Sequence, residues 1–288
     1  MTLIKKCYEE RKPLGQLMHR EAMDYFKQYL IVGGMPQAVE KYVKTKSFKE
    51  VDLVKRDILN LYKSDILKYG GDDAIKVQSI FEEIPSQLQK HEKRFTFSAL
   101  KKEARFREYK DAFFWLQESM TVNIAYNTTE PNIGLRLNRE SSALKCYLGD
   151  TGLLISLAFD EKGLVDEDIY KKILFDKLSF NEGMIMENIV AQMLVASGKK
   201  LYFYFNYDKY DKNNDMEIDF LIAKDKITSR HNVSPIEVKS GKNYSFVSLD
   251  KFRKKYKEYL YTNYVLHTSD LKVEDDIVFL PVYMTGLL

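Results

Sequence analysis

An alternation of apolar and acidic residues from position 216 to 220, within the segment 216–222, is the feature that most constrains the fold of this 288-residue chain. Successive side chains on a β-strand point to opposite faces, so Met216, Ile218, Phe220 and Ile222 would form one apolar face of a strand. Glu217 and Asp219 would lie on the other face. The segment is therefore predicted to be a strand with one face in a core and carboxylates on the opposite side.

A second strand-like segment, residues 236–239, repeats the pattern. Its apolar residues alternate with Glu237 and Lys239, so the carboxylate and the ammonium would share one face. If the two strands are neighbours, their charges meet on one surface, where they must compensate one another or bind a ligand. Carboxylate oxygens suit Mg²⁺, and we therefore predict a metal site between Asp219 and Glu237.

Such a metal ion could activate a water molecule and stabilise a phosphodiester transition state, and Lys239 would assist the water or neutralise developing charge. Upstream, Glu187 interrupts an otherwise apolar helical face. These four residues are the candidate catalytic group. The alternative is a pair of exposed strand faces joined by salt bridges.

Composition excludes several other classes. Hydrophobic residues make up 45% and charged residues 30% of the chain, with a net charge of +3, so any basic surface must be local. Cys7 and Cys146 stand far apart with no nearby histidine, which disfavours a zinc site. The N-terminus is charged and the longest apolar stretch, near residues 152–159, is too short to span a bilayer. A soluble cytoplasmic protein without membrane contact is expected.

Three consecutive regions are predicted, giving a mixed α+β fold class. Residues 1–72 read as helices broken at Gly33–Pro36, and the next break is at residues 70–73. Residues 73–150 read as three helices, the second at Ser98–Ala104, followed by two strands, which suggests a winged helix-turn-helix. Residues 151–288 read as helix, three strands, helix and strand, an α/β domain with a mixed sheet.

A basic stretch at residues 89–110 holds eight lysines or arginines beside four aromatic residues. Six of these cations are predicted to contact DNA phosphates rather than bases. They are Lys93, Arg94, Lys101, Lys102, Arg105 and Arg107. The alternative is a solvated helix face with no ligand.

Five motifs occur in an order that resembles a known family. They are Gly33-Gly-Met-Pro36, Leu148-Gly-Asp-Thr-Gly-Leu-Leu154, Gly183-Met-Ile-Met-Glu-Asn188, Glu217-Ile-Asp-Phe220 and Pro235-Ile-Glu-Val-Lys-Ser-Gly241. Together they look like the uncharacterised C-terminal domain found behind AAA-type ATPase modules in many bacterial and archaeal proteins. The resemblance covers almost the whole chain. It implies a restriction-endonuclease-like, PD-(D/E)xK fold, with Asp219 and Glu237 binding metal, Lys239 catalytic and Glu187 a supporting acid.

One departure from the family concerns the ATPase module. The chain has no Gly-x-x-x-x-Gly-Lys-Ser/Thr phosphate loop, so no ATP site is expected in these residues. The chain is then either a C-terminal fragment, whose partner is the ATPase module, or a protein that has lost that module. The family-like sequence soon after Met1 favours a fragment. Two other functions remain open beside a DNA nuclease: a catalytically silent module that docks DNA or protein, and a regulatory domain for the ATPase.

Overall fold

The computed structural model describes residues 2–90, 92–132, 134–159, 170, 172, 182–212, 214–224, 226, 228–241 and 245–288. The chain divides into two compact units, each assembled from several stretches of sequence. The first unit comprises Met1–Met23, Ala125–Leu144 and Met193–Leu288, and the second comprises Asp24–Ile124 and Lys145–Gln192. This division differs from the three consecutive regions expected from the sequence, because distant segments of the chain fold together.

The helices follow the predicted pattern closely. They are α1 (Thr2–Glu10), α2 (Gln16–Val32), α3 (Pro36–Thr45), α4 (Phe48–Tyr69), α5 (Ala74–Gln89), α6 (Phe106–Glu118), α7 (Thr151–Ala158), α9 (Glu182–Ala196) and α10 (Val247–Tyr256). Both predicted breaks are present: Gly33 adopts a φ of +81° after α2, and Gly70 ends α4. None of the described helices is both long and apolar enough to cross a membrane.

The predicted helix at Ser98–Ala104 is wrong. Only a single 3₁₀ turn, η2 (Phe97–Ala99), forms there. Phe95 and Phe97 both pack against Phe113 of α6, with ring centroids 5.0 and 5.9 Å away. Two side chains spaced by two residues reach the same ring when the backbone between them is extended rather than helical. A winged helix-turn-helix therefore stays a prediction.

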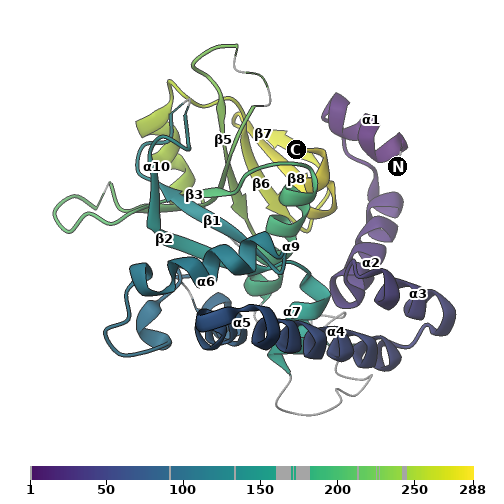
Figure 1. Ribbon diagram of the computed structural model, residues 1–288. Helices are drawn as coiled ribbons and strands as arrows, with labels where there is room; N and C mark the ends of the chain where they lie inside the picture. Colours follow the sequence, from purple (N-terminus) through teal and green to yellow (C-terminus); the bar gives the residue numbers. More distant parts are fainter. Residues whose placement is uncertain are drawn as a thin grey trace. The chain divides into compact units, whose positions relative to one another are not determined.

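The strands form one eight-stranded mixed sheet in the order β2-β1-β3-β4-β5-β6-β8-β7 (Figure 1). They are β1 (Val122–Thr128), β2 (Arg139–Leu148), β3 (Tyr202–Asn206), β4 (Met216–Ala223), β5 (Val233–Val238), β6 (Asn263–His267), β7 (Lys272–Glu274) and β8 (Ile277–Pro281). β3, β4 and β5 are antiparallel neighbours, and β6 runs parallel to β5. The predicted order of helix, three strands, helix and strand, and the mixed α+β class, are confirmed.

The two strands expected to form a wing belong to this same sheet. β1 pairs in parallel with β3, where Tyr126 lies opposite Tyr202. The buried side chain of Asn127 strengthens the junction, because its Oδ1 accepts a hydrogen bond from the Phe205 backbone N at 2.9 Å. A polar side chain thus completes the strand pairing where the parallel ladder is short.

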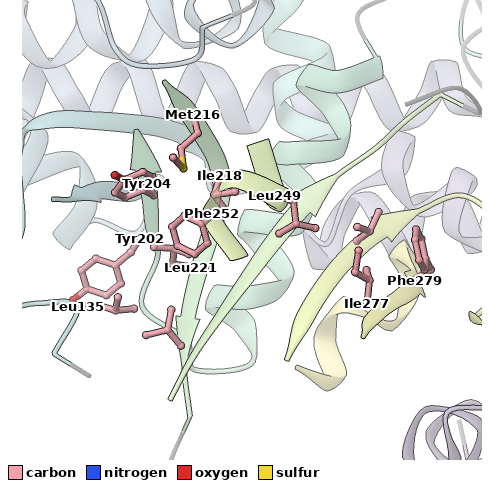
Figure 2. Close-up of a cluster of buried hydrophobic side chains, with 12 residues drawn as sticks. Leu135, Tyr202, Tyr204, Met216, Ile218, Leu221, Leu249, Phe252, Ile277 and Phe279 are labelled. Atoms are coloured by element: carbon pink, nitrogen blue, oxygen red, sulfur yellow. The ribbon is translucent and has the colours of Figure 1, made fainter. Parts of the chain in front are cut away.

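The core of the first unit lies between α10 and the sheet (Figure 2). Leu249 and Phe252 of α10 are fully buried in a cluster with Ile218 and Leu221 of β4. Leu221, rather than the expected Phe220, joins this cluster because the pairing of β3 with β4 is irregular. Tyr204 lies opposite Ile218 but Tyr202 lies opposite Leu221, which leaves two residues of β4 against one of β3. That is the pattern of a β-bulge, and it contains Asp219.

In the second unit, two of the five motifs have a structural role. The Asp150 carboxylate accepts hydrogen bonds from the backbone N of Gly34 at 2.6 Å and of Leu153 at 2.8 Å. The second bond makes Asp150 the N-cap of α7. A Cβ added to Gly152 would lie only 2.7 Å from the Gly33 Cα, so the chain requires glycine at this close approach.

Lys55 of α4 is fully buried beside this junction and donates hydrogen bonds to the Ile31 and Gly152 carbonyl oxygens at 2.8 and 3.2 Å. Burial lowers the pKa of Lys55 from 10.5 to about 8. The folded protein therefore releases this proton at a lower pH than the unfolded chain does. The unfolded state binds more protons between these two pKa values, and stability rises with pH in that window.

We expect the free energy of unfolding to rise on the order of 1 kcal/mol per pH unit between about pH 8 and pH 10. Urea unfolding of wild-type protein and Lys55→Met at several pH values measures this slope. The variant should be less stable overall but should lack the rise. An equal slope in wild-type protein and Lys55→Met would mean that titratable groups other than Lys55 cause the rise in stability with pH.

Candidate functional site

Asp219 and Glu237 lie on neighbouring antiparallel strands, as the sequence predicts. The register of β4 with β5 places Phe220 opposite Ile236. Extending that register by one residue places Asp219 opposite Glu237, and side chains of such a cross-strand pair lie about 5 Å apart at Cβ. The structure therefore brings these two acids together at the end of the β4–β5 ladder.

A backbone hydrogen bond orients Asp219. Its Oδ2 accepts from the Val238 backbone N at 2.8 Å. Together with the bulge at Asp219, this bond holds the carboxylate over the end of β5. Bulges commonly re-aim a side chain beside a functional site, and here the re-aimed group is one of the predicted metal ligands.

Glu237 and Lys239 form a close ion pair. Lys239 Nζ lies 2.6 Å from Glu237 Oε2, and the two side chains are only 21% and 6% exposed. The Lys239 backbone N donates to the Leu266 carbonyl at 2.8 Å, which keeps this residue in register with β6 beyond the last residue of β5. The shared face predicted for Glu237 and Lys239 is thus confirmed by direct contact.

The same sheet contains an exposed counterpart of this pair. Lys272 Nζ and Glu274 Oε2 of β7 are also 2.6 Å apart and also two residues apart on a strand, but their side chains are 52% and 59% exposed. An exposed pair of this kind contributes little to stability. Glu274 is therefore a suitable matched control for Glu237.

The donor set of the site suits a hard cation. Asp219 and Glu237 offer carboxylate oxygens, and Mg²⁺ is commonly bound by one or two carboxylates with water and substrate phosphate completing its shell. Within the described residues, no group of three or more His, Cys, Asp or Glu could hold a metal ion. The protein's share of the coordination would therefore be these two residues.

Glu187, the fourth predicted residue, belongs to the second unit and is buried in a cluster of its own. Its Oε1 lies 2.6 Å from Lys93 Nζ, and its Oε2 lies 3.8 Å from Lys145 Nζ and accepts a hydrogen bond from the Tyr147 hydroxyl at 3.1 Å. The carboxylate is thus held by two ammonium groups and a phenol. This arrangement fixes the start of α9 to β2 and to the chain after α5.

Sequence reasoning missed Lys145 and Tyr147. A signal for Lys145 was present, because a lysine within the apolar segment Leu144–Leu148 must find a counter-charge if the strand is buried. Lys145 is 1% exposed in the structure. Its partner could not be read from the sequence, since Glu187 lies 42 residues further along the chain.

The six predicted phosphate-binding residues fall into two groups. Lys93 is engaged with Glu187, and Arg94 pairs with Glu92 at 2.8 Å. The other four are exposed on the turn before α6 and on its first residues. They are Lys101, Lys102, Arg105 and Arg107.

Two families match parts of the chain. Residues 23–163 match the family described as "Domain of unknown function (DUF8612)". Residues 182–284, which include all four acid and lysine candidates, match "Domain of unknown function (DUF4143)". The latter domain is typically found with AAA ATPases. No curated protein and no solved structure matches the chain.

Proposed function

We propose that this chain is the C-terminal region of an AAA-type ATPase that acts on DNA, and that its first unit is a restriction-endonuclease-like, metal-dependent nuclease domain. The observation that carries the proposal is the convergence of Asp219, Glu237 and Lys239 at the end of the β4–β5 ladder. The order α9-β3-β4-β5-α10-β6 supports it, since this arrangement places an acid on one strand and Glu-x-Lys on the next.

Asp219 and Glu237 would hold a Mg²⁺ ion, which when bound lowers the pKa of water and offsets negative charge on a phosphodiester. The backbone bond from Val238 keeps the Asp219 carboxylate oriented, so little reorganisation is needed on binding. Lys239 would exchange part of its contact with Glu237 for the attacking water or a phosphate oxygen. Its ammonium then orients the nucleophile and neutralises charge as the bond to the leaving oxygen lengthens.

The direct test uses the wild-type chain with supercoiled, linear and single-stranded DNA in Mg²⁺ or Mn²⁺, and calorimetric titration of Mn²⁺ in the absence of DNA. We expect cleavage that stops with EDTA and a single class of Mn²⁺ sites. Calorimetric titration of Mn²⁺ into the variant Asp219→Ala shows whether the heat of Mn²⁺ binding measured for the wild-type chain comes from this site. Protein that binds Mn²⁺ but cleaves none of these substrates would contradict nuclease activity while leaving the metal site in place.

A second candidate function has an observation in its favour. The Glu237 carboxylate already contacts the Lys239 ammonium at 2.6 Å, so the buried charges of this site compensate one another without a metal. A catalytically silent module that docks DNA or protein beside an ATPase would keep this pair as structure. Absence of both Mn²⁺ uptake and cleavage would favour this second function.

In both proposals, DNA contacts the exposed cations on the turn before α6 and on the first residues of α6. We expect Lys101→Gln with Lys102→Gln, and Arg105→Gln with Arg107→Gln, to weaken binding to all duplex sequences similarly. Each lost phosphate contact should flatten the dependence of log K on log salt by about 0.9. Fluorescence anisotropy at several salt concentrations measures both quantities.

The matched control for these variants is Lys49→Gln, which removes an exposed lysine of α4 in the same unit. If α4 contacts no phosphate, this variant should keep the slope of log K against log salt within about 0.5 of the wild-type slope. Wild-type affinity that does not change with salt would leave only the solvated-face interpretation of the basic stretch.

A further inference from the structure

A cavity of about 470 Å³ opens in the second unit beside the C-terminal half of α6. Its lining combines the turn after α4 with one stripe of α6. The lining residues are Gly70, Asp73, Asp111, Phe114, Trp115, Glu118 and Ser119. Asp111, Phe114, Trp115 and Glu118 follow the spacing i, i+3, i+4, i+7, so they occupy a single face of the helix.

This face of α6 is not used by the core. Ala112, Phe113 and Leu116 bury the opposite side of the helix. Phe114, in contrast, is 62% exposed, and Met120 just beyond the helix is 83% exposed. Phe114 and Trp115 both line the cavity and give it an apolar wall that another molecule can cover.

Negative charge surrounds the aromatic residues. Asp73, Asp111 and Glu118 all line the cavity. Lys76 is the nearby cation: its Nζ lies 2.6 Å from Asp73 Oδ1, and this hydrogen bond, with the charge of Asp111, raises the pKa of Lys76. The residues that line the cavity include three carboxylates and no lysine or arginine, so the lining itself is negatively charged, which disfavours phosphates and favours a cation.

We propose that this cavity binds an arginine side chain presented by a partner protein. A planar guanidinium can stack on the Trp115 indole while its N–H groups donate to Asp111 or Glu118. Lysine lacks both the plane and the fork of donors. The volume lies in the range of pockets that hold small-molecule ligands, which is enough for one arginine side chain, and an apolar neighbour of the arginine would cover Phe114. The proposal is independent of nuclease activity.

The chain supplies its own probe, because Trp115 is its single tryptophan. The ligand is an acetylated and amidated Leu-Arg-Leu-Arg-Leu peptide, titrated into the full chain while tryptophan emission is recorded. The matched peptide replaces each arginine by citrulline, which keeps the shape and removes the charge. A third peptide carries lysine, and free arginine amide serves as the small-molecule comparison.

We expect a saturable change in emission with the arginine peptide, and affinity at least about tenfold weaker with the lysine and citrulline peptides and with arginine amide. Asp111→Asn and Glu118→Gln should each weaken binding about tenfold, while Glu21→Gln, an exposed acid of α2, should not. These positions are exposed, and circular dichroism confirms that each variant is folded.

Four results would overturn the proposal. Equal affinity for the citrulline peptide would show that the positive charge does not contribute to binding, and equal affinity for the lysine peptide would make the cavity a general cation site. Equal affinity for arginine amide would remove the partner protein from the proposal. An emission change that never saturates would mean that Trp115 reports solvent conditions and not a binding site.

Discussion

Asp219→Ala and Glu237→Ala are each expected to abolish Mg²⁺-dependent DNA cleavage. Each substitution removes one of the two carboxylates that the described part of the chain offers to the metal. Loss of a ligand from a site with so few cannot be compensated by the other residue. Gel analysis of plasmid cleavage, with Mn²⁺ calorimetry on the same preparations, measures both activity and metal uptake.

Two comparison variants sharpen this prediction. Glu274→Ala breaks the exposed Lys272–Glu274 pair at the same 2.6 Å separation and should leave cleavage unchanged. Lys239→Ala should keep Mn²⁺ binding, and even tighten it because a competing ammonium is removed, but should slow cleavage. Full activity in Asp219→Ala would place the chemistry elsewhere in the chain.

The second large effect concerns stability and not chemistry. Glu187→Gln is expected to lower the free energy of unfolding by about 3–5 kcal/mol, the cost of breaking a buried ion pair by removing one partner. The glutamine matches the shape of the glutamate but cannot balance Lys93 and Lys145, whose side chains are 12% and 1% exposed. The role of a supporting acid, which the family resemblance implies for Glu187, stays a prediction.

Urea unfolding of Glu187→Gln, Lys145→Met and the double variant measures this effect as a double-mutant cycle. We expect a coupling energy of at least about 1 kcal/mol, because both substitutions remove parts of one contact. Glu274→Gln is the matched control and should change stability by less than about 0.5 kcal/mol. A Glu187→Gln protein as stable as this control would show that the cluster contributes nothing to folding.

Local sequence patterns predicted most of the helices and strands correctly, for reasons that can be stated. The alternation at residues 216–222 requires an extended chain with one apolar face, and β4 forms there. Gly33 adopts a positive φ after α2, and a Cβ added to Gly70 would lie 2.5 Å from the Ile66 carbonyl oxygen, so both helix ends favour glycine. The helix expected at Ser98–Ala104 does not form, and the chain just before it is held against Phe113, which lies outside the local window.

Some of the charged contacts could likewise be predicted from local sequence, and others could not. Glu237 and Lys239 are two residues apart, so strand geometry alone brought them to one face, and they meet at 2.6 Å. Lys93, Lys145 and Glu187 come from three separate segments, and no local period relates them. The same holds for Asp150 and Gly34, which lie 116 residues apart in the chain and 2.6 Å apart in the structure.

The sequence by itself determined which charged residues share a face: Asp219 lies on the polar face of one strand, and Glu237 and Lys239 share the polar face of the next segment. Only the tertiary structure decided how each is held. The bulge at Asp219 arises from a mismatch in the pairing of β3 with β4, and the Val238 backbone bond depends on the pairing of β4 with β5. Pairing joins segments distant in sequence, and its energy comes from contacts that exist only once the sheet has formed.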